Sequence, residues 1–216
     1  WPWVIRSFAG GVAPSGLSES DLDGYPLLAG SDLSQPSKTL AAVEQPGAYV
    51  MGHLPDEGLY RMRLWPNNIA WSVLATSCSS PAYHIETEAI VAPETPSGYA
   101  GLVGRYQNES TFYLFHVDGA GAYEVLSAQD GVWRVVQPRQ VDSIINPAGV
   151  ANTLSLQDDG EAMAFAVNGQ VLYQTSTPAL PTGSTGLAGR AGGEPAEVNF
   201  DSYRLFAPSC AGGATE

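Results

Sequence analysis

The sequence predicts an all-β protein, with two antiparallel sheets packed as a sandwich and an irregular N-terminal arm. Many segments alternate apolar and polar residues with a period of two, as in Tyr83–Ile90, so that odd and even positions face opposite sides of a sheet. The 24 glycines and 16 prolines favour frequent turns. No stretch of about ten residues shows helical periodicity, which excludes a mainly helical fold.

Turn-forming dipeptides divide the alternating segments from one another. The turn-like dipeptides are Asp118-Gly119, Asp130-Gly131, Asp159-Gly160 and Asn168-Gly169, and three of them lie between plausible antiparallel partners and predict hairpins. Short strands at this spacing are typical of a two-sheet sandwich. The expected strands are Thr39–Val43, Ala48–Leu54, Gly58–Leu64, Ala70–Ala75, Tyr83–Ala92, Tyr99–Gln107, Thr111–Asp118, Ala122–Ala128, Val132–Gln137, Thr153–Gln157, Ala162–Asn168, Gln170–Thr175, Ser184–Gly189 and Glu197–Phe206.

The chain divides into three parts by composition. Residues 1–38 are dense in Gly, Ser, Pro and Asp and form the expected irregular arm. Residues 39–210 carry the strand pattern and form the sandwich, and residues 211–216 form a C-terminal tail. Trp and Pro at the start of the arm suggest packing on the domain, on an assembly partner or near a membrane anchor, with a loosely attached arm as the alternative.

The charge balance excludes one class of function. Lys and Arg number 9 against 22 Asp and Glu, so the formal net charge is −13. Such a chain repels phosphate backbones, and we expect no nucleic-acid partner. The charge also opposes docking on anionic lipid. No apolar run approaches the roughly 18 residues of a membrane span.

Two cysteines, Cys78 and Cys210, bear on the cellular compartment. Their separation excludes a C-x-x-C redox or zinc motif. A bridge between them would close a loop of about 130 residues, worth roughly 4–5 kcal/mol by loop entropy. The alternative is two free thiols in a cytosolic protein. We expect the disulfide and an extracytoplasmic location, with any targeting or anchoring segment before Trp1 removed or the chain a fragment.

An ordered series of motifs covers about half of the chain. The motifs are Gly101-Leu102-Val103-Gly104-Arg105-Tyr106, Phe112-Tyr113-Leu114-Phe115, Asp118 to Tyr123, Gly131-Val132-Trp133, Asn152-Thr153-Leu154, Phe165-Ala166-Val167-Asn168-Gly169, Gly183 to Ala188, and Val198-Asn199-Phe200-Asp201-Ser202-Tyr203-Arg204-Leu205. This series resembles the concanavalin A-like (laminin-G-like) lectin/glucanase superfamily, which implies a jelly-roll sandwich whose first and last strands are neighbours. That arrangement would bring Cys78 and Cys210 within reach of each other.

Catalysis is not expected. Glucanases of this superfamily place carboxylates on one strand face as Glu-x-Asp-x-Glu or Glu-x-Asp-x-x-Glu, and retaining hydrolysis needs two carboxyls about 5–5.5 Å apart. The candidate here, Glu86-Thr87-Glu88, lacks the Asp and the third acid. A solvated polar face of an outer strand is the favoured explanation of these residues, so a glycoside hydrolase is the third choice among functions.

Candidate binding residues come from the aromatic and polar side chains of the motifs. Sugar sites combine an aromatic platform with hydrogen-bonding side chains, while core packing is the alternative role for each aromatic residue. His116 either points into a groove or is an ordinary sheet histidine. The predicted ligand-binding residues are Arg105, Tyr113, His116, Tyr123 and Trp133.

No cofactor is expected. Calcium is nevertheless common in related lectins, and Asp158-Asp159 or Asn199 and Asp201 could supply its oxygen ligands. The sequence therefore predicts a non-catalytic extracytoplasmic module that binds glycan or a cell-surface protein. The alternative is a structural or protein-interaction subunit of a cell-envelope or filament assembly, contacting its neighbour through the arm.

Overall fold

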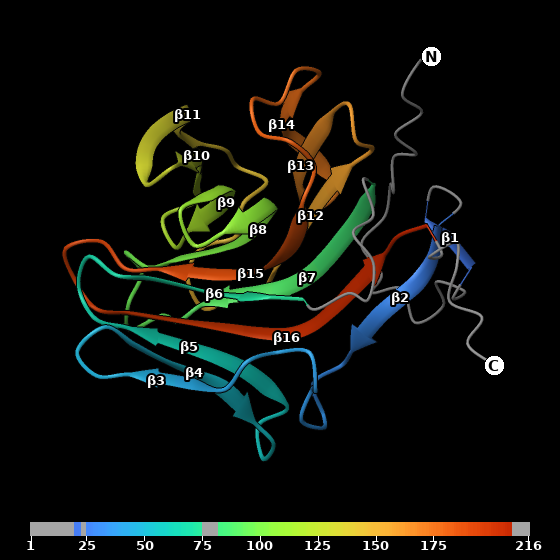
Figure 1. Ribbon diagram of the computed structural model, residues 1–216. Coiled ribbons are helices and arrows are strands. Elements are labelled where there is room, and N and C mark those ends of the chain that lie inside the picture. The colour runs from blue at the N-terminus through green and yellow to red at the C-terminus, as the bar shows by residue number, and fades with distance from the viewer. Residues whose placement is uncertain (1–19, 23–24, 75–81, 209–216) are drawn as a thin grey trace.

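The computed structural model describes residues 20–22, 25–74 and 82–208, which form sixteen strands in two antiparallel sheets (Figure 1). Within these residues no helix is long and apolar enough to cross a membrane. The six-stranded sheet has the order β11 (Val132–Val141), β10 (Ala122–Gln129), β9 (Thr111–Asp118), β8 (Tyr99–Asn108), β15 (Ser184–Arg190) and β6 (Ile69–Val73).

The ten-stranded sheet is organised around β16 (Ala196–Phe206), which pairs with β7 (Tyr83–Val91) along one side. On its other side, the first half of β16 pairs with β5 (Leu59–Leu64) and the second half with β2 (Tyr25–Ser31). The remaining strands extend the sheet outward or border β2: β14 (Gln170–Thr175), β13 (Met163–Val167), β12 (Asn152–Asp158), β4 (Tyr49–Leu54), β3 (Val43–Gln45) and β1 (Ser20–Leu22).

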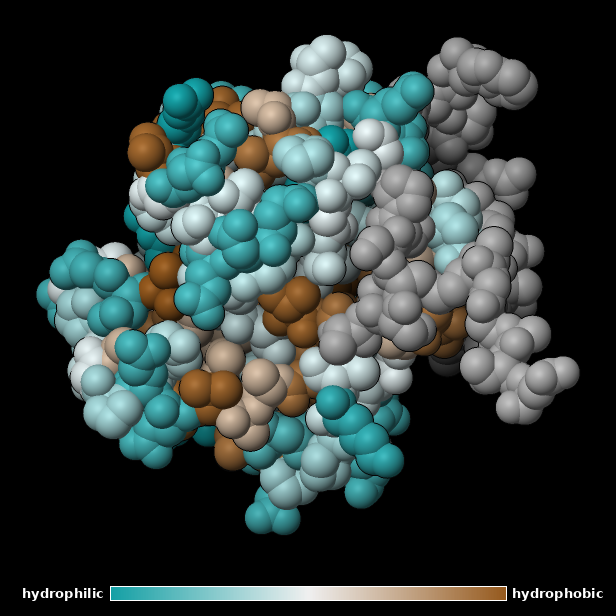
Figure 2. All heavy atoms as spheres, in the orientation of Figure 1, coloured by the Kyte–Doolittle hydropathy of each residue, from teal (hydrophilic) through white to brown (hydrophobic). Residues whose placement is uncertain are grey.

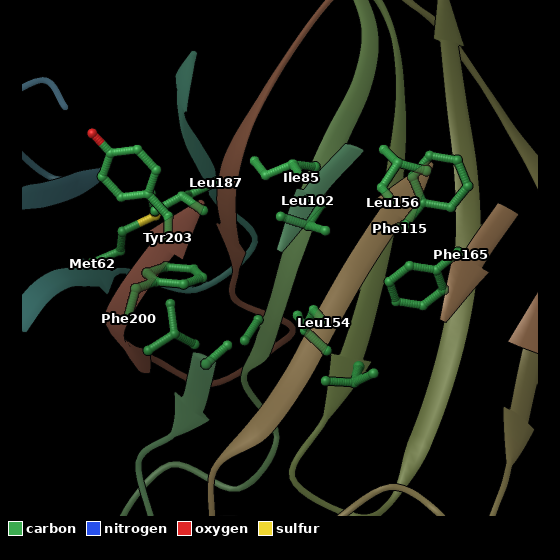
Figure 3. Close-up of a cluster of buried hydrophobic side chains, with 14 of the residues drawn as sticks. Met62, Ile85, Leu102, Phe115, Leu154, Leu156, Phe165, Leu187, Phe200 and Tyr203 are labelled. Atoms are coloured by element: carbon green, nitrogen blue, oxygen red, sulfur yellow. The ribbon is translucent and has the colours of Figure 1, made fainter. Parts of the chain in front are cut away.

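The main hydrophobic core lies between the two sheets, as the alternating pattern predicts. β7 shows the cause directly, because its exposure alternates residue by residue along its whole length. Figure 3 shows the side chains that fill the space between the sheets, with contributions from both. Fully buried members include Met62, Ile85, Leu102, Phe115, Leu154, Leu156, Phe165, Leu187 and Phe200. The predicted two-sheet sandwich is confirmed.

The predicted hairpins are confirmed. Asp118-Gly119 joins β9 to β10, Asp130-Gly131 joins β10 to β11, and Asp159-Gly160 joins β12 to β13. Asn168 and Gly169, between β13 and β14, have φ angles of 50° and 82°, and Asp130 and Gly131 have 51° and 79°. Two consecutive positive φ values define the hairpin turn that favours Asn-Gly and Asp-Gly.

The expected irregular arm is wrong for residues 25–31. These residues form β2, which pairs with the second half of β16 and so belongs to the ten-stranded sheet. The segment that follows also packs on the sandwich, because Leu33 is fully buried and the Ser37 hydroxyl lies 3.0 Å from the hydroxyl of Tyr203. The Pro and Gly within β2 mask its strand character in the sequence. The sandwich therefore begins before residue 39.

Cys78 and Cys210 lie outside the described residues, as do residues 1–19 and the 211–216 tail. The strands that lead to the two cysteines are neighbours, since β7 begins shortly after Cys78 and β16 ends shortly before Cys210. In the β7–β16 register, Phe206 is paired with His84.

Candidate functional site

The outer face of the six-stranded sheet, away from the main core, carries the candidate site. Alternation along β9 separates the two faces: Phe115 and Val117 join the core between the sheets, whereas Phe112 and Leu114 join a second apolar cluster. The other buried members of that second cluster are Val103, Leu126, Ala128 and Ala188. The outer face therefore carries a buried apolar cluster of its own, in contrast to the polar face usual for a solvated sheet.

Four rings form an outer aromatic cluster on this face: Trp71, Tyr106, Phe112 and Trp133. Phe112 is fully buried and lies at the centre, with its ring centroid 4.9 Å from Trp71, 6.0 Å from Tyr106 and 5.5 Å from Trp133. The three surrounding rings stay partly exposed, and Trp133 retains 47% of its surface. Aromatic packing on Phe112 thus holds three rings in place while leaving them accessible.

A charged cluster of Tyr99, His116, Glu124 and Arg190 occupies the same face further along the strands. Glu124 Oε2 accepts hydrogen bonds from Arg190 Nη1 at 3.0 Å and from His116 Nε2 at 3.2 Å. The Arg190 guanidinium lies 4.8 Å from the Tyr99 ring centroid, in cation–π contact. His116 contacts Tyr99 edge to face at 4.6 Å. These contacts fix the orientation of the arginine and the carboxylate.

Small residues make the charged cluster possible. Gly101 lies opposite His116 in the β8–β9 register and opposite Ala188 in the β8–β15 register. A Cβ on Gly101 would lie 2.2 Å from the carbonyl oxygen of Phe115 and 2.7 Å from the Cβ of His116, so only glycine fits. With no side chain on Gly101, Arg190 on β15 reaches across β8 and β9 to Glu124 on β10.

The protonation states follow from burial and hydrogen bonding. Burial lowers the pKa of His116, although its hydrogen bond to Glu124 acts in the opposite direction. The hydrogen bond from His116 lowers the pKa of Glu124, with Arg190 adding to the effect. At neutral pH the cluster therefore holds a neutral imidazole that donates to a carboxylate, beside an arginine. His116 itself is only 1% exposed, so Glu124 and Arg190 present the accessible polar atoms.

The two clusters lie at a defined separation. Phe112 and His116 are four residues apart on the same face of β9, which corresponds to about 13 Å along the strand. The side chains of Leu114, Val103 and Leu126 lie between the two clusters and are buried. An apolar surface with a small number of oriented polar groups is the usual composition of a small-molecule binding site.

Two of the predicted ligand-binding residues, His116 and Trp133, are brought to this face. Tyr113 does not share a face with Trp133, because Tyr113 joins the core between the sheets and its hydroxyl accepts a hydrogen bond from the amide of Ala179 at 2.8 Å. Tyr123 is also in the core, with its hydroxyl 2.9 Å from the carbonyl oxygen of Leu172. Alternation along the strands places both tyrosines inward.

Arg105 is likewise buried, at 3% exposure, and its donors are occupied within the protein. Nε and Nη2 donate to the two carboxylate oxygens of Asp158 at 2.8 Å each, and Nη1 donates to the carbonyl oxygen of Leu180 at 2.7 Å. A bulge in β8 after Gly104 turns this residue inward, and Arg105 has a φ of 47°. Arg105 is therefore part of the structural core and contributes nothing to the accessible face.

Glu86 and Glu88 lie on the outer face of the ten-stranded sheet, remote from the candidate site. Glu86 accepts a hydrogen bond from Arg204 Nη2 at 2.8 Å. Partial burial raises the pKa of Glu88, and the nearby Asp201 and Glu86 charges add to this effect. Among the described residues, no group of three or more His, Cys, Asp or Glu side chains is arranged to hold a metal ion. Asp158 and Asn199, two of the possible calcium ligands, are engaged by Arg105 and Arg61.

Sequence reasoning missed Tyr99, Glu124 and Arg190. A signal for Arg190 is present, because Gly186-Leu187-Ala188-Gly189-Arg190 repeats the pattern of Gly101-Leu102-Val103-Gly104-Arg105. The structure shows that these segments are paired antiparallel neighbours, β15 and β8. The pattern reflects a need for glycine at close contacts in both strands. Of the two arginines, Arg190 is the one that reaches the outer face.

Comparison with solved structures supports the fold. The carbohydrate-binding module CBM66 from Bacillus subtilis aligns with a TM-score of 0.51 and 14% identity over 64% of this chain and 82% of that one. The GH43 BlXynB protein from Bacillus licheniformis aligns with a TM-score of 0.60 and 14% identity, over 82% of this chain and 39% of that one. The GlcNAcα1-4Gal-releasing endo-β-galactosidase from Clostridium perfringens aligns with a TM-score of 0.59 and 10% identity, over 90% of this chain and 65% of that one.

No protein-family model matches the sequence, and no curated protein matches it. At these identities the structural similarities define the fold, an antiparallel β-sandwich of the jelly-roll type. This agrees with the concanavalin A-like sandwich that the motifs imply, whereas the laminin-G-like subdivision stays a prediction.

Proposed function

We propose that the chain is a non-catalytic module that binds a glycan on the outer face of the six-stranded sheet. The observation that carries the proposal is the common orientation of two features: three accessible rings around Phe112, and the fixed Arg190–Glu124 pair. Sugar rings present apolar C–H faces and polar hydroxyl edges. The apolar C–H faces match the aromatic cluster, and the hydroxyl edges match the charged cluster.

The charges favour a neutral glycan. Arg190 is already paired with Glu124, and Arg139 at the same end of the sheet is paired with Asp118 at 2.7 Å. An acidic sugar would have to compete with these internal carboxylates in a chain of net charge −13. Hydroxyl groups face no such competition, because a guanidinium and a carboxylate keep further donor and acceptor capacity after forming one ion pair.

The structural similarities supply secondary support, since one of the similar proteins is described as a carbohydrate-binding module and another as an endo-β-galactosidase. The absence of catalysis is inferred from the placement of the carboxylates. Glu86 and Glu88, the pair singled out in the sequence, lie on the other sheet, and Glu86 is paired with Arg204. On the proposed face, Glu124 is held by two hydrogen-bond donors and has a lowered pKa, which suits an acceptor rather than a general acid.

A glycan array on the full chain tests the proposal, with Trp133→Ala and Arg190→Met as site variants. We expect binding to one class of neutral glycan, unchanged by chelator, with both variants reducing the signal at least about tenfold because each removes a main ligand contact. Trp65→Ala is the matched control, since Trp65 is similarly exposed at 44% but lies outside the cluster. A blank array with folded protein, or full binding by both site variants, would contradict the proposal.

We further infer that the module is extracytoplasmic and that Cys78 forms a disulfide with Cys210. The neighbouring positions of β7 and β16 support this inference, because the described chain approaches both cysteines at the same end of one strand pair. Thiol titration of the unfolded, unreduced protein should then find no free thiol, and reduction should release two. Two titratable thiols before reduction would overturn the inference.

A further inference from the structure

β11 is an edge strand with an unusual surface. Among the described strands it pairs only with β10, and nearly all of its ten residues are exposed. Four large apolar side chains on it are open to solvent: Val132 at 57%, Trp133 at 47%, Val135 at 59% and Val141 at 71%. Figure 2 shows hydrophobic spheres among hydrophilic ones over this strand, at the upper left. Exposed apolar edge strands readily pair with another strand.

The charge of β11 is opposite to that of the whole chain. The strand contains Arg134 and Arg139 and no acidic residue, in a protein of net charge −13. Arg139 is paired with Asp118, whereas Arg134 is exposed and forms no ion pair among the described residues. The free cation thus lies in the middle of the apolar segment Val132–Val136.

Features that usually prevent an edge strand from pairing with another chain, namely proline and β-bulges, are confined to one half of β11. Pro138 and two register shifts in the β10–β11 pairing lie beyond Val135 on the C-terminal side. Residues 132–135 pair regularly with β10, one residue to one residue. The unprotected backbone therefore coincides with the exposed valines, Trp133 and Arg134.

We propose that β11 is a docking edge for an extended segment of a partner protein with the pattern apolar–acidic–apolar. Directly opposed residues in an antiparallel pair interact, so the acidic residue would lie opposite Arg134 and its apolar neighbours opposite Trp133 and Val135. Charge complementarity selects this occupant over a second copy of the chain. Two β11 strands paired with each other would bring their arginines together and join two bodies of like charge.

Amide chemical shifts of the isotope-labelled full chain test this proposal in a titration with two short capped peptides, one alternating valine with glutamate and one alternating valine with lysine. The glutamate peptide should shift the amides of residues 132–136. Arg134→Glu should weaken this response at least about fivefold and transfer the preference to the lysine peptide, because a favourable cross-strand charge pair becomes a like-charge pair.

Lys38→Glu is the matched control, because Lys38 is an exposed cation without an ion pair among the described residues and its reversal changes the net charge equally. It should leave the response of β11 to both peptides unchanged. Equal responses to the two peptides, or shifts concentrated on the edge strands β6 or β14, would overturn the proposal. So would concentration-dependent shifts of β11 without peptide, which would identify a second copy as the occupant.

Discussion

Arg105 and Arg190 end two segments of nearly identical sequence and have opposite environments. In both strands the Leu and the second Gly face the core, as Leu102 and Leu187 show by their full burial. β15 stays regular to its end, so Arg190 projects outward and is about one-third exposed. β8 bulges after Gly104, and Arg105 stays inside against Asp158. One backbone irregularity therefore decides whether an arginine stabilises the core or presents a binding group.

The largest effect separating the two arginines should be on stability. Arg105→Met should lower the free energy of unfolding by about 3–5 kcal/mol, because it leaves Asp158 buried without its partner. Arg190→Met should cost about 1 kcal/mol or less, because its ion pair is partly exposed. Urea unfolding followed by tryptophan fluorescence measures both values.

The double variant Arg105→Met with Asp158→Leu sharpens this comparison. It removes both buried charges and should recover much of the stability lost in Arg105→Met alone. Similar losses of unfolding free energy in Arg105→Met and Arg190→Met would show that burial does not control how much each arginine contributes to stability.

A smaller effect should appear in the pH dependence of the protein's stability, through the charged cluster that contains Arg190. The folded state lowers the pKa of His116 from its ordinary value of 6.5, so the unfolded chain binds a proton that the folded chain resists. Stability from the neutral imidazole is therefore present above that value and declines as the pH falls below it. The lowered pKa of Glu124 acts in the same direction at more acidic pH, below its ordinary 4.5.

His116→Gln isolates the histidine contribution to this pH dependence. Urea unfolding at pH 7 and pH 5 should show a smaller loss of stability in this variant than in the unchanged protein. An equal loss in both proteins would place the pH dependence elsewhere in the molecule.

Most of the fold could be predicted from the sequence, because its signals are local. Period-two alternation and Asp-Gly or Asn-Gly turns determine strands and hairpins directly. β2 was missed because Pro26 and Gly30 resemble loop residues, while its partner β16 is far away in the sequence. Such long-range pairing leaves no local pattern.

The site was less predictable, because it depends on which face each residue occupies. Aromatic content selected both Trp133, which packs on Phe112 at the outer face, and Tyr113, which lies in the core, although alternation from Phe112 would have separated the two faces. The inward turn of Arg105 depends on a bulge, and the role of Glu124 depends on a contact made across two strands. Neither feature has a sequence signature at the residue concerned.

The central position of β16 also constrains how the protein is made. β16 is the last of the described strands to leave the ribosome, yet β2, β5 and β7 all require it as a neighbour. During translation the edges of these three strands that face β16 stay unpaired, and the ten-stranded sheet is completed only after β16 emerges from the ribosome. Folding of the ten-stranded sheet consequently depends on the synthesis of β16, and truncation before residue 196 should yield an aggregation-prone chain rather than a smaller domain.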